Sequence, residues 1–217
     1  MELKFIIFDL DDTLYPSDTG LLHEIGHRIE MWLCDHLELA REDAVAVRRD
    51  YYLRYGTTLG GLIAERDVDV HGFLTFIHDV EVEKYLDPNP ALAEMLNSIP
   101  LRKAIYTNSI SEYARRVLRT LGVEERFEWV IGIEEVGLRN KPDRDAYEHT
   151  LALLGARGPE CVMVEDSVRN LRPAQALGMR TVLVSLEPAQ GVNVDFMMES
   201  VLDVGRVVSD WLPGVVV

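Results

Sequence analysis

Five short runs of apolar residues, rich in β-branched side chains, recur along the chain. They lie at 4–8, 102–106, 129–133, 161–164 and 181–184. Their apolar positions are continuous rather than alternating, which is typical of strands covered on both faces. Helical patterns separate the later runs, at 111–121, 144–154 and 167–177, and a last one is expected at 195–211. This order of elements predicts an α/β fold with a doubly wound parallel sheet.

Glycines mark the ends of three of these helices. Gly122, Gly155 and Gly178 each come just after a helical pattern. Glycine reaches the left-handed backbone conformation that often closes a helix, so we expect that conformation at all three positions.

A long stretch between the first and second strands has no strand pattern. Its apolar periodicity predicts helices at 18–39, 42–55, 59–65 and 72–82. Such an insertion is too large for a crossover helix and is well placed to act as a lid. We therefore expect a helical cap domain at 17–87, inserted after strand 1 of a Rossmann-like core formed by 1–16 and 88–217. Asp87–Pro90 is expected to be the hinge that leads back into the core.

The balance of charge limits the partners. The chain has 22 Lys and Arg against 37 Asp and Glu, a formal net charge of −15. Nucleic acid polymers and anionic membrane surfaces need a surplus of basic residues, so we expect neither as a partner. A small molecule remains possible. We expect the protein to be a monomer or homodimer.

Cysteine use and the N-terminus favour a cytoplasmic protein. Cys34 and Cys161 lie far apart and are expected to be free thiols in a reducing compartment. The first apolar run lacks the basic start and cleavage site of a signal peptide. No window approaches the roughly 18 apolar residues of a membrane-spanning helix.

Polar residues follow four of the predicted strands. Each could merely form a turn or cap a helix. However, the carboxyl ends of parallel strands meet at one edge of the sheet, where ligands bind in folds of this kind. Their joint occurrence there favours a shared site. The residues are Asp9 and Asp11, then Thr107 and Asn108, then Lys141, and finally Glu165 and Asp166.

Two carboxylates at i and i+2 of an extended segment point the same way, so their repulsion must be relieved. A divalent cation relieves it, and oxygen ligands of this kind suit Mg²⁺. A phosphate can then lie against Asp9, with Lys141 and hydroxyl or amide donors on its remaining oxygens. One carboxylate can attack phosphorus while the other, two residues on, protonates the leaving oxygen.

These residues resemble the four motifs of the haloacid dehalogenase-like phosphohydrolase superfamily, in order and along nearly the whole chain. They are Asp9-x-Asp11-x-Thr13, Thr107, Lys141 and Glu165-Asp166. The insertion looks like that family's C1 cap. The resemblance implies an α/β core, an Mg²⁺ cofactor and a small phosphate ester as substrate. Dehalogenases of the family lack the second Asp, so Asp11 favours phosphate chemistry.

The resemblance also implies individual roles. Asp9 would be the nucleophile and form an aspartyl-phosphate, and Asp11 would be the general acid and base. Thr107 and Lys141 would bind the phosphoryl group, and Asn108 would assist them. The metal would be held by Asp9, the backbone carbonyl of Asp11, Asp166 and, directly or through water, Glu165.

A narrower resemblance is to the pyrimidine 5′-nucleotidase subgroup. It is carried by 9–16 (DLDDTLYP), 55–62 (YGTTLGGL) and 84–88 (KYLDP), and 165–171 (EDSVRNL) also fits. The chain departs from that pattern at Tyr113, where a His is expected. In the cap, Tyr55 and its neighbouring tyrosines could stack on a base, with Thr57 and Thr58 at its edge. They could equally pack the cap helices together.

Other functions remain open at this stage. The same core serves phosphosugar and phosphoglycolate phosphatases and phosphomutases. Besides phosphatases and mutases, a signalling module that stores phosphate on an Asp is a third possibility. Such modules are shorter than this chain and carry the phosphorylated Asp after the third strand, whereas Asp9 follows the first. The run 23–27 (HEIGH) matches a zinc-protease pattern, yet Gly26 weakens that helix. We expect His23 and His27 to be solvated on the outside of the cap.

Overall fold

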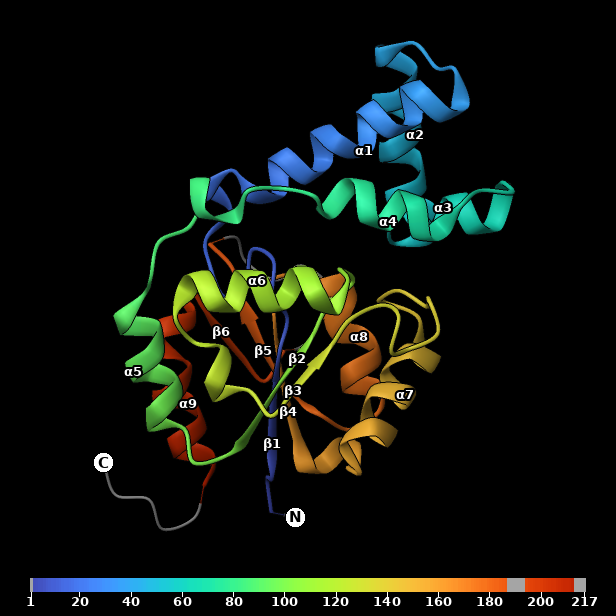
Figure 1. Ribbon diagram of the computed structural model, residues 1–217. Coiled ribbons are helices and arrows are strands. Elements are labelled where there is room, and N and C mark those ends of the chain that lie inside the picture. The colour runs from blue at the N-terminus through green and yellow to red at the C-terminus, as the bar shows by residue number, and fades with distance from the viewer. Residues whose placement is uncertain (1, 187–193, 213–217) are drawn as a thin grey trace.

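The computed structural model describes residues 2–186 and 194–212. In it, all six strands are parallel and form one sheet in the order β3-β2-β1-β4-β5-β6 (Figure 1). The α/β fold expected from the sequence is confirmed. The strands are β1 (Phe5–Phe8), β2 (Arg102–Tyr106), β3 (Trp129–Ile131), β4 (Cys161–Glu165), β5 (Arg180–Val184) and β6 (Phe196–Met198).

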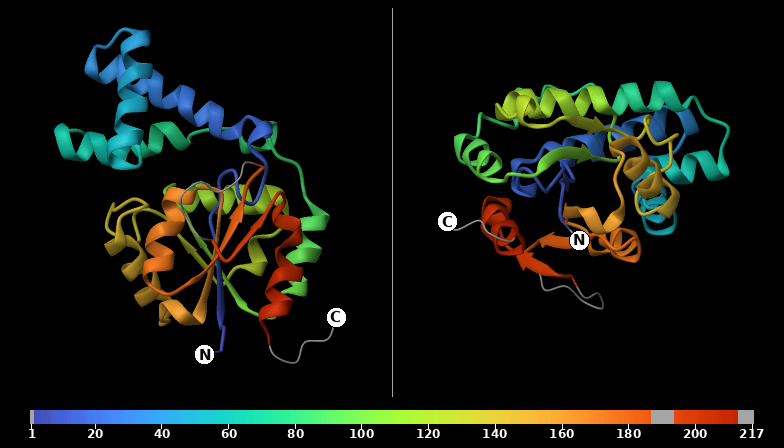
Figure 2. Two further views of the ribbon diagram at one scale, coloured as in Figure 1. Left: turned by 180° about the vertical axis from the view of Figure 1, so that it is seen from behind. Right: turned by 90° about the horizontal axis from the view of Figure 1, so that it is seen from below.

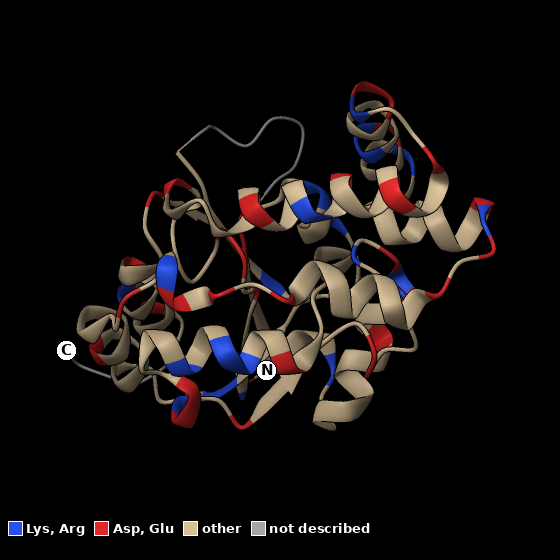
Figure 3. Ribbon diagram, turned by 45° about the horizontal axis from the view of Figure 1, so that its top comes forward, with Lys and Arg blue, Asp and Glu red and all other residues tan. Residues whose placement is uncertain are grey.

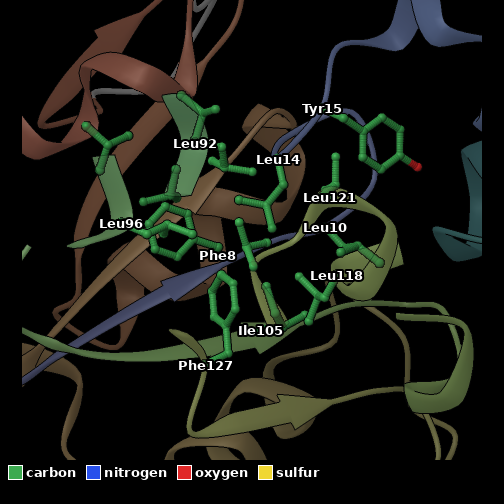
Figure 4. Packing of buried hydrophobic residues seen from close by; sticks show 14 of the residues in the cluster. Phe8, Leu10, Leu14, Tyr15, Leu92, Leu96, Ile105, Leu118, Leu121 and Phe127 are labelled. Carbon is green, nitrogen blue, oxygen red and sulfur yellow. The ribbon is translucent and has the colours of Figure 1, made fainter. Parts of the chain in front are cut away.

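Helices cover both faces of the sheet. All four residues of β1 are apolar and buried, and alternate side chains point to opposite faces, so both faces need a cover. Ile6 and Phe8 join one apolar cluster with α5 (Pro90–Ser98), α6 (Ser111–Leu121) and α9 (Val204–Trp211). Figure 4 shows Phe8 of this cluster among leucines of α5, of α6 and of the segment after β1. Phe5 and Ile7 join the second cluster, with α7 (Arg144–Leu154) and α8 (Val168–Ala176).

The predicted helices of the core need two corrections. The expected helix at 195–211 is a short edge strand, β6, followed by a 3₁₀ turn and then α9. A three-residue strand is too short to show a period of two, and Phe196 and Met197 are exposed at this edge. The second correction is α5, a helix that the sequence pattern did not predict. Asn89 caps that helix by accepting from the N–H of Leu92 at 3.0 Å, with Pro90 in its first turn.

The three predicted left-handed glycines are confirmed. Gly122, Gly155 and Gly178 have φ of 73°, 62° and 81°. Each lies just after α6, α7 or α8, where a side chain would be strained.

Four helices form the layer above the sheet: α1 (Leu21–Leu37), α2 (Arg41–Tyr55), α3 (Thr58–Glu65) and α4 (Val70–His78). They have an apolar cluster of their own, centred on Trp32, Leu33 and Phe73. Figures 1 and 2 show these helices over the carboxyl end of the sheet, joined to the core by two chain segments. The division into a cap at 17–87 and a core formed by 1–16 and 88–217 stays a proposal, in which these four helices belong to the cap and lie above the predicted site.

Candidate active site

Asp9 directly follows β1 at the centre of the sheet. Phe8 is in register with Ile105 of β2 and Val164 of β4. The N–H of Asp9 donates to the carbonyl of Val164 at 2.9 Å, which fixes its backbone, and the side chain is buried. The strand order changes direction between β1 and β4, which is where open α/β sheets bind ligands. Asp9 therefore stands at the topological switch point.

Lys141 lies in the loop before α7, and its ammonium group enters the same site. Nζ lies 2.5 Å from Oδ1 of Asp9 and 2.8 Å from Oε2 of Glu165. It also donates to the carbonyl of Tyr106 at 3.2 Å. The lysine side chain is 1% exposed and that of Glu165 is 0% exposed. Three residues far apart in the sequence thus form one buried, charged cluster.

Burial dominates the electrostatics of this cluster. It raises the pKa of Asp9 to about 8, assisted by the charge of Glu165 and opposed by Lys141. Burial likewise raises the pKa of Glu165 to about 7, again against the effect of Lys141. For Lys141, burial favours the neutral amine, but the adjacent carboxylates outweigh it and keep the pKa above its ordinary value. The site therefore favours a bound cation, which would stabilise both carboxylates in their ionised form.

The residues present fit a divalent cation. Ligand atoms of Asp9, Glu165 and Asp166 lie within 4.8 Å of one another. Within the described ranges 2–186 and 194–212, this is the one group of three or more acidic, histidine or cysteine side chains close enough to hold a metal ion. Lys141 compensates only part of their negative charge. Carboxylate oxygens are hard ligands of the type that Mg²⁺ prefers. Three of the residues expected to hold Mg²⁺, Asp9, Glu165 and Asp166, thus lie together, and Asp11 is not part of this cluster.

The second predicted motif reaches the site from the end of β2. Thr107 is buried, and its hydroxyl accepts from the N–H of Ser109 at 3.0 Å. The Asn108 carboxamide reaches the loop between β3 and α7 that carries Lys141, called the lysine loop below. Its Oδ1 accepts from the N–H of Lys141 at 2.7 Å, and its Nδ2 donates to the carbonyl of that residue at 3.3 Å. Asn108 therefore holds the backbone that positions the lysine.

Residues of core and cap together line an open cavity of about 220 Å³ at these groups. From the core, all seven predicted residues except Glu165 line it. From the cap come the apolar side chains of α1 and α4, together with Tyr52, Thr57 and His78. The sequence analysis did not single out His78. Its only signal is a histidine that ends an otherwise apolar helix.

The cap residues predicted at the substrate come together only in part. Thr57 lines the cavity and caps α3 by accepting from the N–H of Gly60 at 2.9 Å. Tyr55 does not line it, because its hydroxyl is bonded to Glu65 at 2.6 Å on the cap surface. Thr58 is buried away from it. Tyr55 and Thr58 therefore do not line the cavity, whereas Tyr52, which is exposed, does.

Contact between the cap and the lysine loop explains one cap glycine. Gly56 has φ of 91°, and a Cβ there would lie 2.8 Å from the carbonyl oxygen of Lys141 and 2.7 Å from Nδ2 of Asn140. The same Nδ2 donates to the carbonyl of Tyr55 at 2.9 Å. Asn140 was not predicted as a site residue, and it joins the end of α2 to the loop that carries the lysine.

Two other features of the sequence lie outside this cluster. His23 and His27 line a separate surface hollow beside Arg41 and Arg48, and neither belongs to the carboxylate cluster. Acidic residues are spread over cap and core alike in Figure 3. The net charge of −15 therefore says little about this site, in which a few acids and one lysine decide the chemistry.

A doubly wound parallel sheet, with helices above it and a buried carboxylate and lysine cluster at its carboxyl edge, defines an α/β protein with an aspartate at the centre of its site. The family model described as "haloacid dehalogenase-like hydrolase" matches residues 3–178. The chain belongs to this family.

Two curated relatives match most of this chain at less than 30% identity. The chain is 29% identical over 198 residues to a glyceraldehyde 3-phosphate phosphatase of Methanocaldococcus jannaschii, covering 84% of this chain and 85% of that protein. It is 27% identical over 203 residues to phosphate metabolism protein 8 of Saccharomyces cerevisiae, covering 86% of this chain. The match spans 63% of the length of the yeast protein.

Solved structures show the same fold. A HAD phosphatase from Thermococcus onnurineus has a TM-score of 0.63 and 21% identity, covering 94% of this chain and 97% of the other. An L-2-haloacid dehalogenase from Xanthobacter autotrophicus has a TM-score of 0.62 and 18% identity, covering 95% and 98%. In the described parts of the chain, no helix is both long and apolar enough to cross a membrane.

Proposed function

We propose that this protein is an Mg²⁺-dependent phosphatase that hydrolyses small phosphate monoesters through an aspartyl-phosphate on Asp9. The observation that carries the proposal is the buried contact of Lys141 with both Asp9 and Glu165 at the switch point of the sheet. The cytoplasmic location and the monomeric or dimeric state expected from the sequence stay proposals with it.

The chain's own residues supply most of the chemistry. An Asp9 carboxylate oxygen attacks phosphorus, and the ester oxygen leaves with a proton from Asp11. Lys141 and Thr107 bind the phosphoryl oxygens and stabilise the charge that develops on them. A water molecule then gives its proton to Asp11 and attacks phosphorus, which releases phosphate and restores Asp9. Mg²⁺, held by Asp9, the Asp11 carbonyl, Asp166 and Glu165, would offset the negative charge of the phosphoryl group.

For the leaving group, we propose a nucleoside 5′-monophosphate, with a pyrimidine base. The subgroup resemblance supports this choice, and so does Tyr52. Tyr52 is 54% exposed and lines the same cavity as Thr57, and we propose that a base stacks on its ring.

The size of the cavity favours a second candidate, a small sugar phosphate. At about 220 Å³ it lies below the roughly 300–1,000 Å³ of sites that take drug-sized ligands. One relative is named a glyceraldehyde 3-phosphate phosphatase.

Phosphate release from a panel of esters tests both candidates. The panel includes UMP, CMP, AMP, glyceraldehyde 3-phosphate, phosphoglycolate and a hexose phosphate, each with and without Mg²⁺. We expect UMP and CMP to give the highest kcat/KM. A preference for the three-carbon ester would favour the second candidate. Transfer of the phosphoryl group to a sugar acceptor, without release, would instead indicate a mutase.

A further inference from the structure

The carboxylate of Asp11 receives three hydroxyl groups. The Tyr15 hydroxyl donates to Oδ1 at 2.5 Å, and the Tyr113 hydroxyl donates to the same atom at 3.0 Å. The Ser109 hydroxyl donates to the other oxygen, Oδ2, at 2.9 Å. Asp11 is therefore held on both oxygens, but unequally.

The two tyrosines are buried donors from different parts of the chain. Tyr15 is 3% exposed and lies on the segment that leads from β1 to the cap. Tyr113 is 0% exposed and lies on the first turn of α6, at the position where the subgroup pattern has a histidine. Both hydroxyls donate to the carboxylate of Asp11 in the structure.

The carboxylate of Asp11 can accept only a limited number of hydrogen bonds. Each carboxylate oxygen has about two lone-pair sites. On Oδ1 the two tyrosine hydroxyls fill both. On Oδ2 the Ser109 hydroxyl fills one and leaves the other without a donor among the hydrogen bonds above, and Asp11 lines the cavity.

We propose that Tyr15 and Tyr113 are positioning residues that occupy Oδ1 of Asp11 and so direct proton transfer to the leaving group through Oδ2. The proposal rests on the phosphatase function above. In the first half-reaction, the bond from Asp9 to phosphorus forms and the bond from phosphorus to the ester oxygen breaks. The ester oxygen takes the proton from Oδ2, and Asp11 is left as a carboxylate. In the second half-reaction, Oδ2 takes a proton from the attacking water.

The cap contacts this arrangement. The ring of His78, at the end of α4, lies with its centroid 4.8 Å from that of Tyr113. Arg116, one turn further along α6, donates to the carbonyls of His78 and Val80. Tyr15 lies on one connection between core and cap, and these contacts lie on the other. The orientation of Asp11 is therefore fixed by residues that border both connections.

Leaving groups of different basicity test the proposal. An aliphatic ester needs a proton on its leaving oxygen, whereas p-nitrophenolate leaves without one. The ratio kcat/KM includes steps only up to departure of the leaving group, so it reports this proton transfer. In Tyr113→Phe we expect kcat/KM for the best aliphatic ester of the panel to fall about tenfold or more, since general acid catalysis contributes 10²–10⁴-fold. We expect kcat/KM for p-nitrophenyl phosphate to stay within about twofold.

Three further variants complete the experiment. Tyr15→Phe removes the other donor to Oδ1 and should show the same difference between the esters, which keeps the test open if one variant folds poorly. Asp11→Asn should show a larger difference in the same direction. Tyr147→Phe is the matched control, because this buried tyrosine donates to the carbonyl of Asn170 at 2.5 Å on the other face of the sheet. It should leave the ratio between the two esters unchanged.

The outcomes separate this inference from the proposed function. If the wild-type protein hydrolyses neither ester, the phosphatase function is wrong. If it hydrolyses both, and the Oδ1 variants lower kcat/KM equally for the two esters or for neither, the positioning role is wrong while the function stands.

Discussion

The ammonium group of Lys141 lies 2.5 Å from Oδ1 of Asp9, and both side chains are buried. A buried charge is tolerated only when it is paired, and here one lysine serves two carboxylates. The same contact is therefore important for stability as well as for chemistry, because its loss leaves acids in the interior without a partner.

We expect Lys141→Met to abolish phosphatase activity and to lower the free energy of unfolding by about 3–5 kcal/mol, the usual cost of breaking a buried ion pair. Urea denaturation measures the second effect. The matched control is Lys103→Met, whose ammonium group donates to the carbonyls of Ile99 and Leu101 and should cost about 1 kcal/mol. An equal cost for the two variants would contradict the stabilising role of the buried cluster.

Mg²⁺ should stabilise the folded protein through the carboxylate cluster. At a hundredfold excess over Kd, a ligand that binds only the folded state adds about 2.7 kcal/mol. We expect a rise in Tm with added Mg²⁺, and loss of both this rise and the activity in EDTA. Asp166→Asn should remove most of the rise in Tm. Asp67→Asn, which makes the same change of charge at an exposed position of the cap, should keep it. The same rise in both variants would place the metal elsewhere.

The buried His78 should make the protein less stable in mild acid. Burial lowers its pKa from 6.5 to about 4, although the backbone hydrogen bond with Leu74 and the charge of Asp11 act against this. Between these two values the unfolded chain binds a proton that the folded protein excludes. The contribution to stability is therefore present above pH 6.5 and is lost as the pH falls toward 4, by about 3 kcal/mol.

The pH dependence of urea unfolding, compared between the wild type and His78→Gln, isolates this contribution. The difference between the free energies of unfolding of wild type and His78→Gln should change between pH 6.5 and 4. The control is His23→Gln, at an exposed position of the cap, which should keep the pH dependence of the wild type. Parallel curves for wild type and His78→Gln would show that burial of this ring is not linked to its protonation.

Two glycines with positive φ test the contact between the cap and the lysine loop. Gly122, at 73°, has nothing within 4 Å of an added Cβ, so Gly122→Ala should cost about 1 kcal/mol of stability and leave kcat/KM unchanged. Gly56, at 91°, would place its Cβ against Asn140 and the Lys141 backbone. Gly56→Ala should therefore also lower kcat/KM. Equal kinetics in the two variants would show that the cap loop does not help to position the lysine.

Much of the site follows from the position of residues in the sequence. Asp9, Thr107 and Glu165 each come at or just after the end of a strand, and parallel strands bring such ends to one edge. Lys141 needed the family motif as well, because nine residues, 132–140, separate it from the end of β3. The apolar runs are long enough to indicate strands, except for β6, whose three residues lie at an exposed edge.

The rest depends on contacts that no local pattern encodes. Tyr113 is 102 residues from Asp11, and its hydroxyl reaches the carboxylate only because α6 packs over the end of β1. From the sequence alone, Tyr52 and Tyr55 of the cap are equally good candidates to stack on a substrate base. The structure separates them, since Glu65 of α3 holds the hydroxyl of Tyr55 at the surface. Which polar group faces a cavity is thus decided by packing between helices rather than by residue type.

The most direct measurement is of a covalent phosphoryl group on Asp9. A single turnover with an excess of enzyme over ³²P-labelled ester, quenched in acid within milliseconds, should yield radiolabelled protein, with the label on the peptide that contains Asp9. Hydroxylamine should remove the label, and Asp9→Asn should form none and release no phosphate. Full phosphatase activity in Asp9→Asn, or a label on another residue, would contradict the assignment of Asp9 as the nucleophile.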